Sequence, residues 1–227
     1  MSSSPWDRRI ERAEELAAAI PAAAELLRFY LEVARFQRSV AQAALPSMAL
    51  DSPELERALR PHYERLVCLM QRIAPPEAAG DEAFLHHLTV QPYAEQQARS
   101  AATSRTAVQP LCPYCGENPV AAVLRPEGEG GKRFLLCSLC ATEWEFRRLL
   151  CPRCGEEDPV KLPVFTAEQF PHVRVEACES CLTYMKAVDL TRNGMAVPEV
   201  DELAAVALDL WAREQGYTKL QINVIGM

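Results

Sequence analysis

The chain has 227 residues, of which 49% are hydrophobic and 24% are charged, and this composition excludes a collagenous or wholly disordered protein. Its formal charge at pH 7 is −7, whereas proteins that follow phosphate backbones are usually basic, so we expect no nucleic-acid partner. The uncharged stretch at 16–24 is far shorter than the roughly 20 apolar residues that cross a bilayer, and acids stand where a signal peptide has its apolar core. We therefore expect a cytoplasmic protein without membrane insertion, whose thiols stay reduced.

Residues 1–109 are expected to form a helical domain, an irregular bundle of four to six helices. Ser4 is a suitable N-cap with Pro5 in the first turn, and a run rich in Ala, Glu, Arg and Leu continues to about residue 44. Pro21 divides this run into two helices. Apolar residues of the second helix recur at spacings that give it one buried face.

Three further helices are predicted in this domain. One opens at Ser52, and Pro61 predicts a kink or break in it. A short one is capped by Asp81, and the last runs from Pro92 toward Thr106.

One cysteine and three histidines of this half carry no predicted chemistry. Cys68 lies at helical spacing among apolar residues, so it is predicted to be a small buried side chain. No metal-ligand pattern accompanies His62, His86 or His87, and we interpret them as core or surface residues.

After residue 110 the sequence changes to short β-rich runs separated by turns. A helix is predicted again from Val200 to about Gln215, and Gly216 follows it as a cap. Acidic residues in its first turn complement the positive end of the helix dipole. They are Glu199, Asp201 and Glu202.

Eight of the nine cysteines follow residue 110 and form four CxxC pairs, and two such pairs complete a tetrahedral shell of four thiolates around one ion. The pairs belong to an internal repeat, because CPYCGENPV and RFLLCSLCAT align with CPRCGEEDPV and VRVEACESCLT. We therefore assign the pairs to two sequential sites, although interleaved pairing stays open. The first site is Cys112, Cys115, Cys137 and Cys140, and the second is Cys151, Cys154, Cys178 and Cys181.

The two units require metal for their stability, because domains shorter than about 40 residues seldom fold on a hydrophobic core alone. A structural ion contributes on the order of 10–16 kcal/mol of coupled binding and folding free energy. Four thiolates leave no open coordination position, so we expect structural sites rather than catalytic ones. The spacing does not separate zinc from iron, and electron transfer by iron stays open as an alternative.

The nucleic-acid interpretation of the ribbons is disfavoured by charge, because residues 112–186 contain nine basic and eleven acidic residues. No Ser/His/Asp set or phosphate-binding loop accompanies the cysteines, and we predict that the protein is not an enzyme. The strip Thr142, Glu143 and Trp144 directly follows the first site. Trp144 is expected either to cover the core of the first ribbon or to anchor a partner.

The segments CPYCGENPV, RFLLCSLCATEWEFRR, CPRCG and CESCLTYMKAVDL, with the helix DELAAVALDLWAREQGY, resemble the FdhE family of formate dehydrogenase accessory proteins. The resemblance covers about residues 110–217 and includes all eight paired cysteines. It implies a cytoplasmic maturation factor that binds the catalytic subunit of respiratory formate dehydrogenase before export. It also implies two rubredoxin-like sites holding iron or zinc, with Thr142, Glu143 and Trp144 as candidate partner contacts.

The predicted architecture is therefore α+β, with an irregular helical bundle followed by two tandem rubredoxin-like (zinc-ribbon) units and a C-terminal helix. We expect four parts, which are residues 1–109, 110–147, 148–190 and 191–227. The alternative function is a rubredoxin-like electron-transfer or thiol-redox protein that acts on a client cysteine, selenocysteine or metal centre.

Overall fold

Helices dominate the N-terminal half of the structure, a computed structural model that describes residues 4–43, 45–74, 81–101, 109–128, 130–224 and 226. Helix α1 (Pro5–Ala19) starts at Ser4, whose hydroxyl accepts a hydrogen bond from the backbone N–H of Asp7 at 3.1 Å. A short 3₁₀ helix, η1 (Pro21–Ala23), then leads into α2 (Ala24–Ala41). The predicted cap at Ser4 and the predicted interruption at Pro21 are both present.

Two helix breaks predicted at prolines are absent. Helix α3 (Pro53–Ile73) runs through Pro61, and a single helix, α5 (Glu82–Ser100), replaces the two predicted around Pro92. Pro92 cannot donate to the carbonyl of Leu88, but the side chain of Gln37 donates to that carbonyl at 3.0 Å. A neighbouring helix thus satisfies the acceptor that the proline leaves free. The predicted continuation to Thr106 lies outside the described residues.

Cys68 is exposed, so its predicted burial is also wrong. Leu66 and Met70 are fully buried one turn apart on α3. Cys68 lies two residues from each, which places it on the opposite side of the helix. The spacing of apolar residues in the sequence did not by itself locate the buried face of α3.

The second half forms one mixed sheet in which neighbouring strands follow the order β3-β2-β1-β6-β5-β4. The first repeat supplies β1 (Pro119–Glu127), β2 (Gly130–Cys137) and β3 (Glu143–Glu145). The second supplies β4 (Val164–Thr166), β5 (Val173–Cys178) and β6 (Thr183–Asp189), after a 3₁₀ turn, η2 (Pro159–Lys161). Short β7 (Thr218–Lys219) pairs with β6.

The two repeats join head to tail, because strands within each repeat are antiparallel whereas β1 and β6 are parallel. The register at the junction pairs Ala121 with Lys186 and Leu124 with Asp189. The two ribbons therefore form one continuous sheet rather than two separate sheets.

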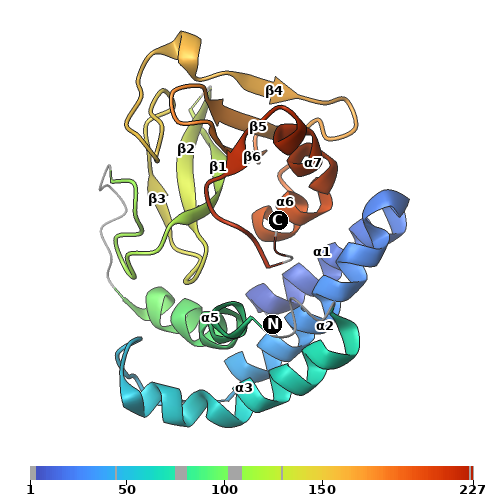
Figure 1. Cartoon of the computed structure of the whole chain (residues 1–227), viewed down its shortest axis with the longest axis vertical. Helices are drawn as coiled ribbons and strands as arrows, with labels where there is room; N and C mark the ends of the chain where they lie inside the picture. The colour runs from blue at the N-terminus through green and yellow to red at the C-terminus, as the bar shows by residue number, and fades with distance from the viewer. Residues whose placement is uncertain are drawn as a thin grey trace.

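The two faces of the sheet are covered by different parts of the chain (Figure 1). On one face, α6 (Pro198–Ala204) and α7 (Val206–Glu214) pack against β1, β5 and β6, with Phe165 and Trp211 in edge contact at 4.7 Å. On the other face, residues of β1, β2 and β3 share a core with α2, α3 and α5. Figure 1 shows the helical half at one end of the sheet and β4 at the other.

The predicted helix from Val200 to Gln215 is present in two pieces, interrupted at Ala205. The buried ammonium of Lys186 donates to the backbone carbonyls of Glu202 and Ala205 and to the carboxylate of Asp209. The carbonyls at the interruption therefore have a hydrogen-bond donor. The helix can break in this buried position without leaving these acceptors unpaired. Gly216 follows α7 with the positive φ of 87° that its predicted capping role requires.

The acidic residues at the start of α6 make buried ion pairs in addition to facing the helix dipole. Asp201 accepts hydrogen bonds from Arg12 of α1 at 2.6 and 3.0 Å and lies 2.8 Å from Nε2 of His172. Burial raises the pKa of Asp201, but hydrogen bonds from His172 and Arg12 outweigh burial and hold it below its ordinary value. Glu199 pairs with Arg9, which also pairs with Glu95 of α5 at 2.8 Å. These pairs lock the helical half onto α6.

Replacing Arg12 with Ala should destabilise the fold strongly, because it leaves the carboxylate of Asp201 buried without its guanidinium partner. We expect a loss of about 3–5 kcal/mol in the free energy of unfolding, measured by urea denaturation of the metal-loaded protein. The control is Arg57→Ala, which breaks the exposed pair with Glu54 and should cost at most about 0.5 kcal/mol. Equal effects of the two substitutions would show that the α1 to α6 contact is not a stabilising one.

Candidate metal centres

The sulfurs of Cys112, Cys115, Cys137 and Cys140 converge between the start of β1 and the end of β2, all within 4.8 Å of one another. The Sγ atoms of Cys112 and Cys140 are 3.5 Å apart, and those of Cys115 and Cys137 are 3.4 Å apart. This first centre is deeply placed, since only Cys115 is partly accessible. The sulfurs are too far apart for disulfides, in which they are about 2.05 Å apart.

The second centre repeats this arrangement with Cys151, Cys154, Cys178 and Cys181, again within 4.8 Å of one another. Its Sγ distances are 3.7 Å between Cys151 and Cys181 and 3.6 Å between Cys154 and Cys178. The structure therefore groups the cysteines sequentially rather than in interleaved pairs.

The backbone conformation of the two centres explains why both repeats begin with the pattern CPxCG. In the first knuckle of each, the glycine after the second cysteine has a positive φ, 80° at Gly116 and 77° at Gly155. Each glycine N–H donates at 3.0 Å to the carbonyl of the first cysteine, Cys112 or Cys151. Only glycine adopts this conformation without strain, which accounts for the CPxCG pattern.

The four-sulfur geometry fits a tetrahedral metal ion. A metal–sulfur bond of about 2.3 Å places the sulfurs of a regular tetrahedron about 3.8 Å apart. The shortest sulfur–sulfur separations, 3.4–3.7 Å, are slightly below that value, and all four sulfurs of each group lie within 4.8 Å of one another. Backbone N–H groups of Leu139, Cys140 and Arg153 approach cysteine sulfurs at 3.4–3.5 Å, as donors to thiolates do. Both groups thus have the donor set and the spacing of a zinc or iron site.

The two centres differ in accessibility. In the first, Cys112, Cys137 and Cys140 are buried under the helical half. In the second, Cys154 is exposed and Cys181 is half-buried. The same ligand set thus stands in a shielded and an open environment.

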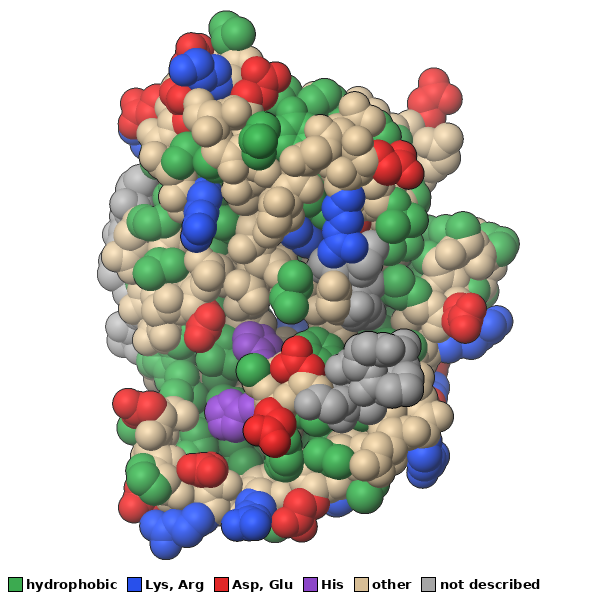
Figure 2. Space-filling view, in the orientation of Figure 1, with side chains coloured by type: hydrophobic (Ala, Val, Ile, Leu, Met, Phe, Trp, Pro, Cys, Tyr) green, Lys and Arg blue, Asp and Glu red, His purple; other side chains and the backbone are tan. Residues whose placement is uncertain are grey.

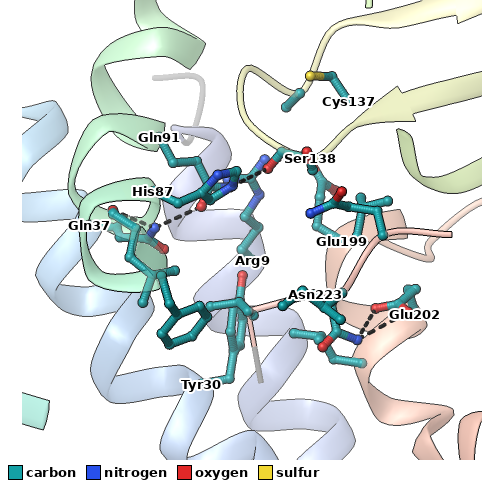
Figure 3. A pocket seen from close by; sticks show the side chains of 18 of the residues that line it. Arg9, Tyr30, Gln37, His87, Gln91, Cys137, Ser138, Glu199, Glu202 and Asn223 are labelled. Carbon is teal, nitrogen blue, oxygen red and sulfur yellow. Dashed lines mark hydrogen bonds and ion pairs between the residues drawn. The ribbon is translucent and has the colours of Figure 1, made fainter. Parts of the chain in front are cut away.

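A cavity of about 250 Å³ lies beside the first centre, where the helical half meets α6 (Figure 3). We call it the junction cavity; its lining includes Arg9, His87, Ser138 and Glu199. Nε2 of His87 lies 3.1 Å from the backbone carbonyl of Ser138, a residue that stands between two cysteines of the first centre in the sequence. Burial lowers the pKa of His87 below its ordinary value. Figure 2 shows histidine side chains where the sheet and the helical half meet. A helix face therefore supports the metal knuckle directly.

The three residues of the predicted partner-binding strip lie in different environments. Trp144 is fully buried at 0% exposure, and its indole N–H donates to the carbonyl of Gln109 at 2.8 Å. Its side chain is a core residue of the first ribbon, so it does not form an exposed anchor. Thr142 and Glu143 are half-buried, and Glu143 makes a bidentate ion pair with Arg125 at 2.6 Å.

Sequence reasoning missed the buried polar residues that join the helical half to α6. His172 belongs to no motif in the sequence, yet its Nε2 lies 2.8 Å from a carboxylate oxygen of Asp201. The signal that could have revealed Arg9 and Arg12 is their position on the same face of α1 as Trp6, Ile10 and Ala13, all of them buried. An arginine on an apolar helix face requires a carboxylate partner elsewhere in the chain.

Comparison with known proteins decides the relationship. The model of the FdhE central domain matches residues 111–148, and that of the FdhE C-terminal domain matches residues 149–225. The chain belongs to the FdhE family. The two matches meet between the first and second centres, so each FdhE domain model contains one four-cysteine group.

Individual relatives agree with this assignment. The FdhE homologue of Aquifex aeolicus is 39% identical over 51% of this chain and 41% of its own length. The homologue of Pseudomonas aeruginosa is 36% identical over 55% of this chain and 42% of its own length. The matches thus span about two fifths of these curated relatives. The crystal structure of the FdhE protein from Pseudomonas aeruginosa superimposes with a TM-score of 0.73 and 26% identity, covering 99% of this chain and 97% of that one.

The difference in accessibility predicts sequential metal release. A coloured chelator in excess should remove about one ion per chain quickly from the open second centre and the other slowly from the shielded first centre. Cys154→Ser should abolish the fast phase, whereas Cys115→Ser, the matched change at the more accessible ligand of the first centre, should abolish the slow one. A single release phase in the unmodified protein would contradict this prediction.

Proposed function

We propose that this FdhE-family chain is a cytoplasmic accessory protein that assists maturation of respiratory formate dehydrogenase by binding its catalytic subunit before export. Membership of the family supports the maturation role. Among the described residues, every helix is too short or too polar to cross a bilayer. The protein would act as an assembly chaperone rather than as an enzyme.

The observation that carries this proposal is the pair of closed four-sulfur groups built into one sheet. In each group four thiolates would complete the coordination of a zinc or iron ion and leave no position for a substrate. The ion would supply conformational order to knuckles that are too short to order themselves. Residues 110–147 and 148–190 would then form two rigid ribbons that present a fixed surface to the client.

We propose the recess beside Thr142 and Glu143 as one part of the client surface. It has a volume of about 270 Å³ and is lined by Arg99 of α5, Arg125 of β1 and Cys140 of the first centre, together with Thr142 and Glu143. The metal knuckle and a helix end meet there, so a bound client would contact both halves of the chain.

The second candidate function is electron transfer or thiol redox chemistry on a client cysteine, selenocysteine or metal centre. Exposure of Cys154 favours it, because an accessible ligand shortens the path from the ion to a partner. Iron-loaded protein whose visible spectrum bleaches reversibly on reduction would favour this function. Colourless, zinc-loaded protein would exclude it.

Affinity purification of the tagged full chain from cells respiring formate tests the proposal. We expect the catalytic subunit of formate dehydrogenase in the eluate, together with two metal ions per chain, one for each four-sulfur group. The variant Glu143→Arg should recover less of the subunit. The double variant Arg125→Glu with Glu143→Arg is the control for folding, because it restores the ion pair in reversed order. An eluate without any formate dehydrogenase subunit would contradict the proposed function.

A further inference from the structure

One half of a sheet face has no helical cover in the part of the chain that the structure describes. The core between the sheet and the helical half includes residues of β1, β2, β3 and β6, but none of β4 or β5. Helix α7 packs on the opposite side of β5. Val164 of β4 is paired with Glu176 of β5, and both side chains lie on the uncovered face. In Figure 1 this region is the end of the sheet farthest from the helical half.

A groove of about 340 Å³ lies on this face, between β4, β5 and the connection from the first repeat to the second. We call it the arginine groove. Its volume is within the range of ligand-binding clefts. Cys151 and Cys178 of the second centre contribute to its lining, so the second metal knuckle fixes its shape. The arginines that line it are Arg133, Arg148, Arg153 and Arg174.

The groove has more cations than anions. Its one lining carboxylate, Glu176, is shared by Arg133 at 2.8 Å and Arg174 at 2.7 Å. Arg148 is exposed and donates to the backbone carbonyl of Gly131. Arg153 is exposed, and its guanidinium has no partner among the described residues. Two guanidinium groups therefore lack a carboxylate in a chain whose formal charge is −7.

Aliphatic side chains lie beside these cations. Leu149 is 50% exposed and Val164 is 52% exposed, and both line the groove with the half-buried Leu162. Exposed arginines next to exposed aliphatic groups complement a ligand that has carboxylates next to aliphatic side chains. A polyphosphate backbone would leave the aliphatic part uncovered.

We propose that the arginine groove docks a segment of the partner protein in which acidic residues alternate with aliphatic ones. Its carboxylates would bind Arg148 and Arg153, and its aliphatic side chains would pack on Leu149 and Val164. This inference rests on the proposed function, because it assigns the segment to the client that the chain matures. The recess beside Thr142 and Glu143 lies at the other metal centre and is a separate contact.

The binding test uses the full, metal-loaded chain and a fluorescein-labelled peptide in which glutamate alternates with leucine and valine. We expect saturable binding that weakens as salt increases, and at least about tenfold weaker binding when glutamine replaces glutamate. Arg153→Glu should weaken binding about tenfold as well. The matched control is Arg28→Glu, a charge reversal on the exposed side of α2 at a residue that also has no partner among those described. Unchanged metal content would show that both variants are folded.

Any one of these peptide results overturns the inference: no binding of the acidic peptide, equal binding of the glutamine peptide, or equal binding to Arg153→Glu and Arg28→Glu. Tight binding of single-stranded DNA in place of the peptide would also overturn it. Hydrogen exchange of the complex with the dehydrogenase subunit provides a second test, in which protection is expected at 162–166 and 174–176. If protection appears only outside these segments, the proposal for the arginine groove is overturned, but the proposed function is retained. Failure of the subunit to bind at all contradicts the proposed function, and the peptide test then stands independently.

Discussion

Convergence of four thiols on one point, twice in the same chain, is the constraint on which the rest of this structure depends. Sulfurs 3.4–3.7 Å apart repel one another once they ionise, so the geometry is stable only around a cation. The ion fixes the knuckles, and each knuckle fixes the strands that enter and leave it. Because β1 of the first repeat pairs with β6 of the second, order in one repeat is passed to the other through backbone hydrogen bonds.

The same sheet also determines which surfaces of the chain are covered and which are open. One face is covered by α6 and α7, and the acidic start of α6 binds arginines of α1, so the two ends of the chain are joined through Arg9 and Arg12. Glu202 of α6 is buried between Lys186 and Lys219. Burial raises the pKa of this carboxyl, but the two ammonium groups outweigh burial and lower it to about 2. The carboxylate thus stays charged and paired at neutral pH. The helical half shields the first centre, and the second centre lies open beside a groove rich in arginine.

The sequence was informative where the chemistry is local. CxxC spacing and the internal repeat favoured the sequential grouping of the cysteines that the structure has, and Ser4 and Pro21 mark helix boundaries because capping involves neighbouring residues. It was uninformative where a distant residue decides. Pro92 lies within a helix because Gln37 donates to the carbonyl of Leu88, and the predicted C-terminal helix is interrupted at Ala205 next to the buried ammonium of Lys186. The pairing of β1 with β6 likewise depends on strands that are far apart in the sequence.

Native mass spectrometry of the full chain, purified without chelator, tests the central claim most directly. The account predicts one dominant species with two metal ions bound through eight deprotonated thiols, and loss of both the ions and the folded charge-state distribution on acidification. A folded, metal-free chain whose mass shows these cysteines joined as disulfides would contradict it.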